Sequence, residues 1–174
     1  MTECSQVAVE PAMQHDATVV ANLMELYSHD LSAAFSLELG TDGRFGYERL
    51  PLYWSEPEQR FAFLIRCEGR VVGFVLATRG CSPLTADPEL LDIAEFFVLR
   101  RYRRSGVGRR AAFLLWNRLP GTWTVRVSER NPSALSFWSG VIAEFSSGTA
   151  TQSTQPGNPN PWRVFSFESA AATA

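Results

Sequence analysis

One stretch of the sequence, residues 93–119, constrains the fold most because it joins a strand signal directly to a helix signal. The run of bulky apolar residues at 93–99 is typical of a strand, and from Val107 apolar residues recur at helical spacing. Between them, Gly106 and Gly108 allow a tight turn that gathers backbone N–H groups at the exposed first turn of the helix. A strand, a glycine turn and a helix in this order are typical of an anion site.

Positive charge is concentrated beside this turn. Six of the sixteen arginines fall within eleven residues that contain no acid, and the chain has no lysine. Ten arginines and eighteen acidic residues lie elsewhere, so the remainder carries a formal charge of about −8, while the whole chain carries −2. Guanidinium groups beside a helix N-terminus suit a phosphate or pyrophosphate. Nucleic-acid binding is the alternative, but the acidic remainder weighs against it, and we expect no nucleic-acid partner.

Two motifs carry a resemblance to a known family. Residues 103–108 read Arg-Arg-Ser-Gly-Val-Gly, which resembles the Arg/Gln-x-x-Gly-x-Gly/Ala loop of the GNAT superfamily of acyl-CoA-dependent N-acetyltransferases. Residues 131–138 read Asn-Pro-Ser-Ala-Leu-Ser-Phe-Trp, which is similar to the Asn-x-x-Ala-x-x-Phe-Tyr signature of the family's next helix. The resemblance extends over about residues 7–168. It implies an α/β (α+β) fold with a mixed, mostly antiparallel sheet of six or seven strands, about four flanking helices, and a splayed parallel pair at the cofactor site.

The resemblance also implies that the chain binds acetyl-CoA (CoA). Backbone groups of three strand residues would pair with the pantetheine as if it were another strand: Phe97, Val98 and Leu99. The turn would hold the pyrophosphate through Arg103, Arg104, Ser105, Gly106, Val107, Gly108, Arg109 and Arg110. Three residues of the second motif would lie near the CoA arm: Asn131, which also caps its helix, Phe137 and Trp138. The alternatives are a solvated basic turn and, for the two aromatic residues, ordinary core packing.

Transfer of an acetyl group to an amine needs a base, and Glu95 is the candidate. It is a lone carboxylate in an apolar strand, where desolvation raises its pKa toward a useful range. Asp92 is the fallback, because it lies where some histone-acetylating members carry their catalytic acid residue. The two are three residues apart and point to opposite faces unless a bulge intervenes. The alternative for Glu95 is a purely structural pair with an arginine.

The resemblance breaks at Trp138, where many members carry a tyrosine. An indole N–H can donate a hydrogen bond but cannot give up its proton, so a tyrosine acting as general acid at that site is excluded. The thiolate would then leave by way of water or another donor. An alternative function follows from this departure, namely a catalytically weak domain that binds acyl-CoA as a sensor.

The expected acceptor is a primary amine of a small molecule or peptide, attacking directly in a ternary complex. An acidic excess over residues 25–58 favours a cationic amine. The candidate residues for acceptor contact are Tyr27, His29, Tyr53 and Trp54, with Tyr47 in the same aromatic cluster. The alternatives are an aromatic cover over the core and, for His29, an exposed or capping position at a helix end.

Hydrophobic spacing and chain breakers predict the remaining elements. Strands are expected at residues 6–10, 61–67, 71–78, 90–99, 122–127, 141–145 and 162–167. Helices are expected at residues 17–28, 31–39, 107–119 and 132–140. Residues 45–54 and 80–89 are predicted loops, residues 146–161 a mobile loop, and residues 169–174 a frayed tail. One domain spanning residues 1–174 is expected at this length.

Three cysteines, Cys4, Cys67 and Cys81, form an odd set without metal-type spacing. We therefore expect ordinary thiols, no disulfide framework and no metal site. No apolar run approaches the roughly 18 residues of a membrane span, and the N-terminus lacks a secretory pattern. The expectation is a cytoplasmic protein without a membrane partner, as a monomer or homodimer.

Overall fold

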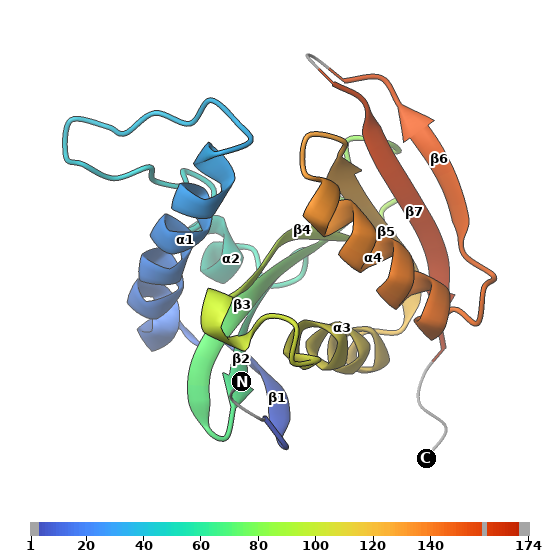
Figure 1. The fold of residues 1–174 in the computed structure, drawn as a ribbon, viewed down its shortest axis with the longest axis horizontal. Helices are drawn as coiled ribbons and strands as arrows, with labels where there is room; N and C mark the ends of the chain where they lie inside the picture. The colour runs from blue at the N-terminus through green and yellow to red at the C-terminus, as the bar shows by residue number, and fades with distance from the viewer. Residues whose placement is uncertain (1–3, 158–159, 171–174) are drawn as a thin grey trace.

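A mixed seven-stranded sheet forms the centre of the molecule (Figure 1). The computed structural model describes residues 4–157 and 160–170. The strands are β1 Val7–Pro11, β2 Arg60–Cys67, β3 Arg70–Arg79, β4 Leu91–Val98, β5 Gly121–Ser128, β6 Thr151–Gln155 and β7 Trp162–Ser169, in the order β1-β2-β3-β4-β5-β7-β6. The helices are α1 Ala17–Ser32, α2 Leu52–Ser55, α3 Val107–Arg118 and α4 Pro132–Phe145, with short 3-10 turns η1 Gln14–Asp16 and η2 Arg100–Tyr102. The predicted fold class is confirmed.

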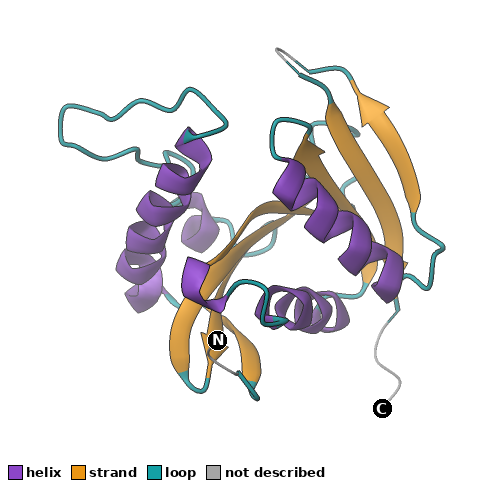
Figure 2. Cartoon of the chain, in the orientation of Figure 1, coloured by secondary structure: helices purple, strands orange, loops and turns teal. Residues whose placement is uncertain are grey.

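The helices cover opposite faces of the sheet (Figure 2). One core lies under α3 and α4, where Trp116 of α3 and Trp123 of β5 are completely buried. The other lies under α1 and α2, where Met24 of α1 packs with Phe74 of β3. Burial of aromatic side chains of this size stabilises both layers.

Among the described strands, the single parallel pair joins β4 and β5, with α3 as the crossover between them, as predicted. Its register is short, since only residues 91–93 of β4 pair with residues 123–125 of β5. Beyond Ile93 the two strands have no further pairing with each other among the described residues. The strands therefore separate at this point, and the edge of β4 that faces β5 is left open.

Two predicted elements are wrong, and the loop predicted at residues 45–54 ends in the short helix α2. The helical stretch expected at residues 31–39 is absent, because α1 itself continues to Ser32 and residues 33–39 form no helix or strand. The strand expected at residues 141–145 is instead the last part of α4. Val141 and Ile142 are buried in the same core as Trp138, so they continue the apolar face of that helix. A short apolar run cannot by itself distinguish the two structures.

The C-terminal part is more regular than predicted. The polar stretch at 146–161 contains strand β6, whose five residues are all exposed because it forms the outer edge of the sheet. The frayed tail was expected to begin at residue 169, but Ser169 is the last residue of β7. Ser169 is buried, and its hydroxyl donates to the Trp116 carbonyl at 2.5 Å. Residues 171–174 of that tail lie outside the described residues.

The expectation of ordinary thiols is wrong for two cysteines, because Cys4 and Cys67 form a disulfide. The register of β1 and β2 pairs Val7 with Cys67, which brings the segment before β1 beside the end of β2. Spacing in the sequence cannot reveal that pairing. The Glu68 carboxylate also accepts from the N–H groups of residues 5 and 6, at 2.9 and 2.8 Å. Cys81 is a free cysteine.

Asp30, near the end of α1, ties that helix to the turn after β4. Its carboxylate lies 2.6 Å from Arg100 and 2.5 Å from Arg103. Partial burial acts to raise the pKa of Asp30, but hydrogen bonds and attraction from the two guanidinium groups outweigh it and lower the pKa below its ordinary value of 3.8. The ion pair therefore contributes stability only while Asp30 is ionised.

Replacing Asp30 with Asn should lower the free energy of unfolding at neutral pH by about 1 kcal/mol, a modest figure because both arginines are substantially exposed. Since the folded-state pKa is lowered, this contribution is present above the ordinary pKa and is lost as pH falls through the folded-state value. Urea unfolding of both proteins at neutral pH and near pH 3 measures it. An equal difference at both pH values would contradict an ionic origin.

Candidate functional site

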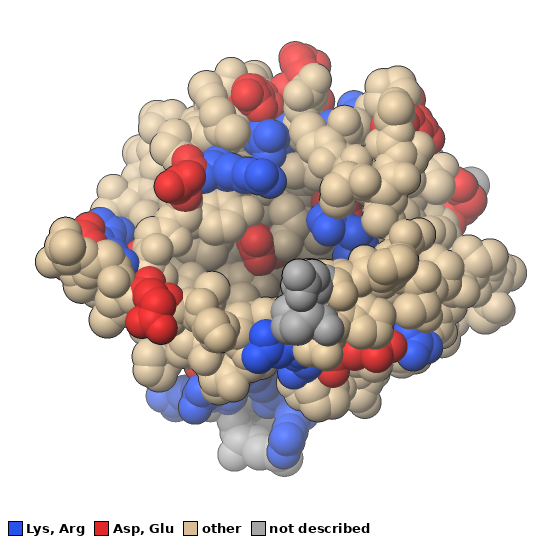
Figure 3. All heavy atoms as spheres, turned by 90° about the horizontal axis from the view of Figure 1, so that it is seen from above, with Lys and Arg blue, Asp and Glu red and all other residues tan. Residues whose placement is uncertain are grey.

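The site lies where β4 and β5 separate. Figure 3 shows that the face seen from above is hollowed, with an acidic side chain at the floor of the hollow and arginine side chains around it. On β4 the charged residues are Asp92 and Glu95, and on β5 the nearest is Arg126, one residue beyond the last pairing position.

A β-bulge on β4 decides which way Glu95 points. In the pairing of β3 with β4, Leu76 lies opposite Glu95 and Ala77 opposite Ile93, so Ala94 is an extra residue without a partner. Ala94 packs in the core under α1, and the extra residue turns Glu95 to that same face instead of the opposite one. Asp92, two residues before Ala94, also lies on that face. The bulge therefore brings the two candidate carboxylates to one side of the sheet.

Asp92 is committed to a buried ion pair. Its side chain is 2% exposed, and its oxygens lie 2.7 Å from Arg126 Nη2 and 3.1 Å from Thr124 Oγ1. Both oxygens of this carboxylate are thus engaged in contacts between β4 and β5. The purely structural pair with an arginine that was considered for Glu95 is thus made by Asp92 instead. Arg126 and Thr124 were not found from the sequence, although the parallel pairing places them opposite and beside Asp92.

Glu95 is half-buried and has no ion pair within residues 4–157 and 160–170. Burial raises the pKa of Glu95 above its ordinary value of 4.5, and the charge of Asp92 adds to the rise. Hydrogen bonds from the hydroxyl groups of Tyr27 and Tyr47, and attraction from Arg126, act in the opposite direction without cancelling it. The result is a carboxyl whose protonation lies closer to neutral pH than that of an exposed glutamate.

The tyrosines around Glu95 are donors. Burial, reinforced by the negative charge of Glu95, raises the pKa of Tyr27 and of Tyr47 well above the ordinary value, and raises the pKa of Tyr53 to about 12. Tyr53 is 4% exposed and packs beneath the guanidinium of Arg60, so it belongs to the core. Their hydroxyl protons are retained at neutral pH, which suits hydrogen bonding to a carboxylate.

Two other predicted acceptor residues lie apart from Glu95. The Trp54 indole donates to the Ala12 carbonyl at 2.9 Å, which fixes its ring at the edge of a neighbouring groove. His29 is exposed and, two residues after Tyr27 on α1, faces another side of the helix. This is the exposed position considered for it from the sequence.

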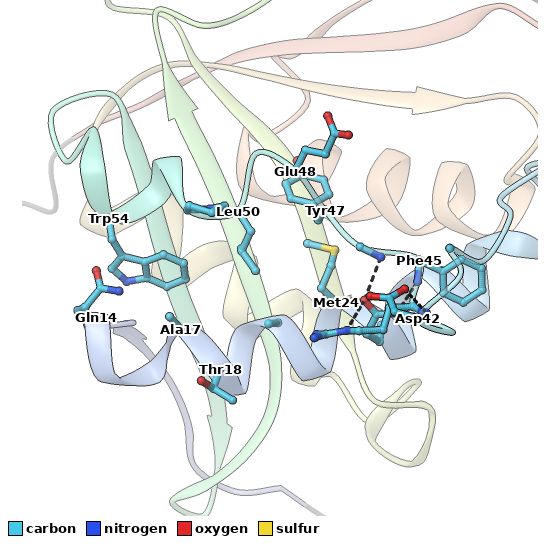
Figure 4. Close-up of a pocket in the computed structure, with 16 residues that line it drawn as sticks. Gln14, Ala17, Thr18, Met24, Asp42, Phe45, Tyr47, Glu48, Leu50 and Trp54 are labelled. Carbon is cyan, nitrogen blue, oxygen red and sulfur yellow. Dashed lines mark hydrogen bonds and ion pairs between the residues drawn. The ribbon is translucent and has the colours of Figure 1, made fainter.

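A groove of about 890 Å³ lies beside Glu95, between α1 and residues 40–54 (Figure 4). Apolar walls come from residues that include Met24, Phe45, Leu50 and Trp54, and its carboxylates are those of Glu25, Asp42 and Glu48. Among the described residues that line it, the guanidinium is that of Arg44, which lies 3.6 Å from Glu25. Tyr47 lines the groove and also interacts with Glu95, so this side chain is a wall shared by the groove and the carboxyl.

The glycine turn has a left-handed backbone conformation immediately before α3. Gly106, immediately before α3, has a φ of 79°, and Arg104 has a φ of 60°. This left-handed region is strained for residues with a side chain, which explains glycine at position 106. The first N–H groups of α3 have no partner within the helix and are directed toward the turn. At Gly108 a Cβ would come within 3.2 Å of the Phe137 ring, so α3 packs tightly against α4 here.

Three of the arginines expected to hold a pyrophosphate have partners elsewhere. Arg103 pairs with Asp30 and its Nε donates to the Val98 carbonyl at 2.7 Å. Arg109 pairs with Glu144 of α4. The Arg110 guanidinium donates to the carbonyls of residues 4 and 5. Arg104 is exposed and has no ion pair within the part of the chain that the structure describes. The groups that the turn presents to an anion are therefore its backbone N–H groups and the guanidinium of Arg104, and not a cluster of guanidinium groups.

The second motif supports α4 in the predicted way. Asn131 caps that helix, since its Oδ1 accepts from the Ala134 N–H at 3.1 Å. Trp138 is buried, with its ring 5.0 Å from Phe96 and 6.1 Å from Trp116, which is the core packing considered for it. Phe137 is partly buried and fills the space beside Gly108.

Within residues 4–157 and 160–170, no three His, Cys, Asp or Glu side chains come together as metal ligands would. None of the helices in those same ranges combines the length and the apolar character needed to span a membrane.

Comparison with known proteins identifies a family. The profile of the acetyltransferase (GNAT) family matches residues 20–139. No curated protein matches the chain significantly in sequence. An acetyltransferase from Thermus thermophilus has a similar structure, with a TM-score of 0.64 and 19% identity over 94% of this chain and 98% of that one.

Two further solved structures share the fold. The ribosomal-protein-S18-alanine N-acetyltransferase from Escherichia coli gives a TM-score of 0.61 and 12% identity, over 97% of each chain. The spermidine N-acetyltransferase from Vibrio cholerae, in complex with CoA and spermine, gives 0.64 and 10%, over 95% of this chain and 96% of that one. The family match over more than half of the sequence, on a sheet with the same architecture, shows that this chain belongs to the acetyltransferase (GNAT) family.

Proposed function

We propose that this protein transfers an acetyl group from acetyl-CoA to a primary amine of a small molecule or peptide, by direct attack in a ternary complex. One observation carries the proposal: a half-buried carboxyl, Glu95, with a raised pKa and no ion pair among the described residues, lies where β4 leaves β5. Family membership supports acetyl transfer. The amine is supported by a carboxyl suited to accept a proton from an ammonium group.

The chain has features that fit acetyl-CoA. The open edge of β4 after Ile93 offers backbone groups of residues 94–98 to an extended ligand, and the turn at Gly106 offers N–H groups to a pyrophosphate. Arg104 could add a charged contact. The Val98 carbonyl already accepts from Arg103, and the pairing of Leu99 with Val72 shows that the backbone groups of Phe97 face β3. The N–H and C=O groups of Phe96 and the N–H of Val98 are therefore better placed to pair with the pantetheine. When bound, acetyl-CoA supplies the acetyl group as a thioester.

Glu95 acts as the general base in this proposal. It accepts a proton from the ammonium of the acceptor, directly or through a water molecule, which leaves a neutral amine able to attack. The raised pKa makes Glu95 a stronger base than an exposed glutamate, while hydrogen bonds from the hydroxyls of Tyr27 and Tyr47 favour its ionised form. Asp92 and Arg126 form the ion pair that joins β4 to β5 next to Glu95.

The acceptor is expected to be cationic. The groove beside Glu95 has three carboxylates, and its one guanidinium is already close to Glu25. Such a surface attracts a positively charged amine and disfavours an anionic substrate.

A weakly active acyl-CoA sensor is the second candidate. Trp138 is part of the core and cannot give a proton to a leaving thiolate, and the raised pKa of Tyr27 and Tyr47 makes these residues poor acids as well. An acetyl-CoA turnover screen over polyamines, aminoglycosides, amino acids and peptides separates the two. Tight acetyl-CoA binding with no acceptor in that screen would favour the sensor.

Replacing Glu95 with Gln should lower turnover by about a hundredfold or more, because the base is removed, while acetyl-CoA affinity stays nearly unchanged. Steady-state kinetics with the best acceptor from the screen and calorimetric titration with acetyl-CoA measure the two effects. Asp92→Asn is the paired variant, expected to reduce stability more than it reduces turnover per folded molecule. A large loss of turnover in folded Asp92→Asn, with none in Glu95→Gln, would transfer the role to Asp92.

Replacing Gly106 with Val should weaken acetyl-CoA binding by at least about tenfold, since a branched residue strongly disfavours the left-handed conformation that shapes the turn. Isothermal calorimetry measures the affinity, and circular dichroism verifies folding. Gly140→Ala is the matched control, because a Cβ at that helical position meets no other atom and should leave binding unchanged. Wild-type affinity in folded Gly106→Val would argue against cofactor binding at this turn.

A further inference from the structure

Glu25 of α1 holds a segment that has no regular structure of its own. One carboxylate oxygen accepts from the Phe45 N–H at 2.8 Å, and the other accepts from the Gly46 N–H at 3.0 Å. Arg44 approaches the same carboxylate at 3.6 Å, and the close-up in Figure 4 shows these interactions as dashed lines. Residues 33–51, which connect α1 to α2, form no helix or strand. A single side chain on a helix therefore anchors the middle of a long irregular connection.

The residue that follows this anchor reaches the candidate base. Tyr47 comes directly after Gly46, is partly buried, and directs its hydroxyl to the Glu95 carboxylate in a hydrogen bond. Its backbone carbonyl accepts from the Leu50 N–H at 2.9 Å, which is a local turn contact and fixes no position relative to α1. Tyr47 and Leu50 also pack in the core under α1, and the hydrogen-bonded tie between this stretch of chain and α1 is made by Glu25.

We infer that Glu25 is a positioning residue, which fixes the segment at Phe45 and Gly46 so that the Tyr47 hydroxyl stays on the Glu95 carboxylate. The carboxylate of Glu25 lines the groove, and its hydrogen bonds go to the backbone of residues 45 and 46 rather than to the base. Its effect on the base is therefore transmitted through two backbone hydrogen bonds and one tyrosine.

Every other charged or titratable group that acts on Glu95 is held independently of Glu25. Tyr27 stands on α1 itself, and Tyr53 on α2 is buried against β2. Asp92 and Arg126 are held together on β4 and β5. Only Tyr47 belongs to the irregular connection, and its hydroxyl also interacts with that of Tyr53. Loss of Glu25 should therefore reach Glu95 through Tyr47.

The direction of the effect follows from the hydrogen bond. A donor to a carboxylate stabilises its charged form, so removing the Tyr47 hydroxyl should raise the pKa of Glu95 further. Tyr47→Phe removes a donor to the ionised carboxylate and should raise this pKa by about one unit. Glu25→Gln keeps the side-chain volume but presents an amide N–H₂ where one oxygen stood. It should loosen Tyr47 and raise the pKa of Glu95 by roughly half a unit.

The test is a carboxyl ¹³C NMR titration of Glu95 in the full chain, with the signal assigned by its loss in Glu95→Gln. Four proteins form a cycle: wild type, Glu25→Gln, Tyr47→Phe and the double variant. Glu25→Gln should raise the pKa of Glu95 when Tyr47 is present and leave it unchanged when residue 47 is Phe. Equal shifts in both backgrounds, no shift, or a shift to lower pH would overturn the inference.

Two further variants control the experiment. Arg44→Gln removes the ion pair and leaves both N–H groups on Glu25, so it should not change the pKa of Glu95. Tyr27→Phe should raise that pKa whether residue 25 is Glu or Gln. If Glu25→Gln does not fold, Glu25→Asp, which keeps the charge but shortens the reach, takes its place in the cycle with the same expected pattern.

The inference rests on the proposed function only for its consequence in catalysis, since the NMR titration needs no substrate. In an active enzyme, the acidic limb of the kcat/KM profile should move to higher pH with the titrated carboxyl. If Glu25 and Tyr47 are coupled in the NMR titration but the acidic limb of the kcat/KM profile does not move, then Glu95 is not the base. The positioning role of Glu25 would still hold in that case. Absence of coupling in the titration would overturn the positioning role itself, whatever the activity.

Discussion

The site depends on one extra residue in one strand, the bulge at Ala94. Without it, Glu95 would point into the core under α3, where an uncompensated carboxylate is costly to bury. With it, Glu95 faces α1 and its tyrosines, just beyond the last point at which β4 pairs with β5. The Asp92–Arg126 pair on the preceding positions holds the two strands together up to that point. A local irregularity of the backbone thus places a titratable carboxyl at the beginning of an open strand edge.

Helix α1 links the two halves of the proposed site. Near its middle, Glu25 holds the segment that carries Tyr47. Further along, the Tyr27 hydroxyl interacts with Glu95. Near the end of the helix, Asp30 forms ion pairs with two arginines of the turn after β4. The proposed acceptor side and the proposed cofactor side are therefore supported by one rigid element.

Patterns along the chain predicted the fold and the strand, turn and helix at the candidate site well, because they are local. The glycine turn, the switch of apolar spacing at Val107 and the Asn131 cap all act over a few residues, and each is confirmed. The partners of Arg103, Arg109 and Arg110 could not be predicted, since Asp30, Glu144 and the Cys4 segment are brought to them only by tertiary folding. The Cys4–Cys67 disulfide depends on strand register in the same way. The bulge at Ala94 was allowed for in the sequence but could not be located without the pairing partner Leu76.

The open edge of β4 also links the stability of the chain to its surroundings. Backbone N–H and C=O groups on this edge have no strand to pair with, so they depend on solvent for their hydrogen bonds. Any extended molecule that satisfies them binds the native chain and not the unfolded one. At a concentration one hundred times its dissociation constant, such a molecule adds about 2.7 kcal/mol to the unfolding free energy, a large share of the stability of an ordinary domain. The fraction of this protein that stays folded on heating or resists proteolysis would then rise with the concentration of that ligand. The open edge of β4 would in this way link the folding stability of the chain to the ligand concentration in the cell.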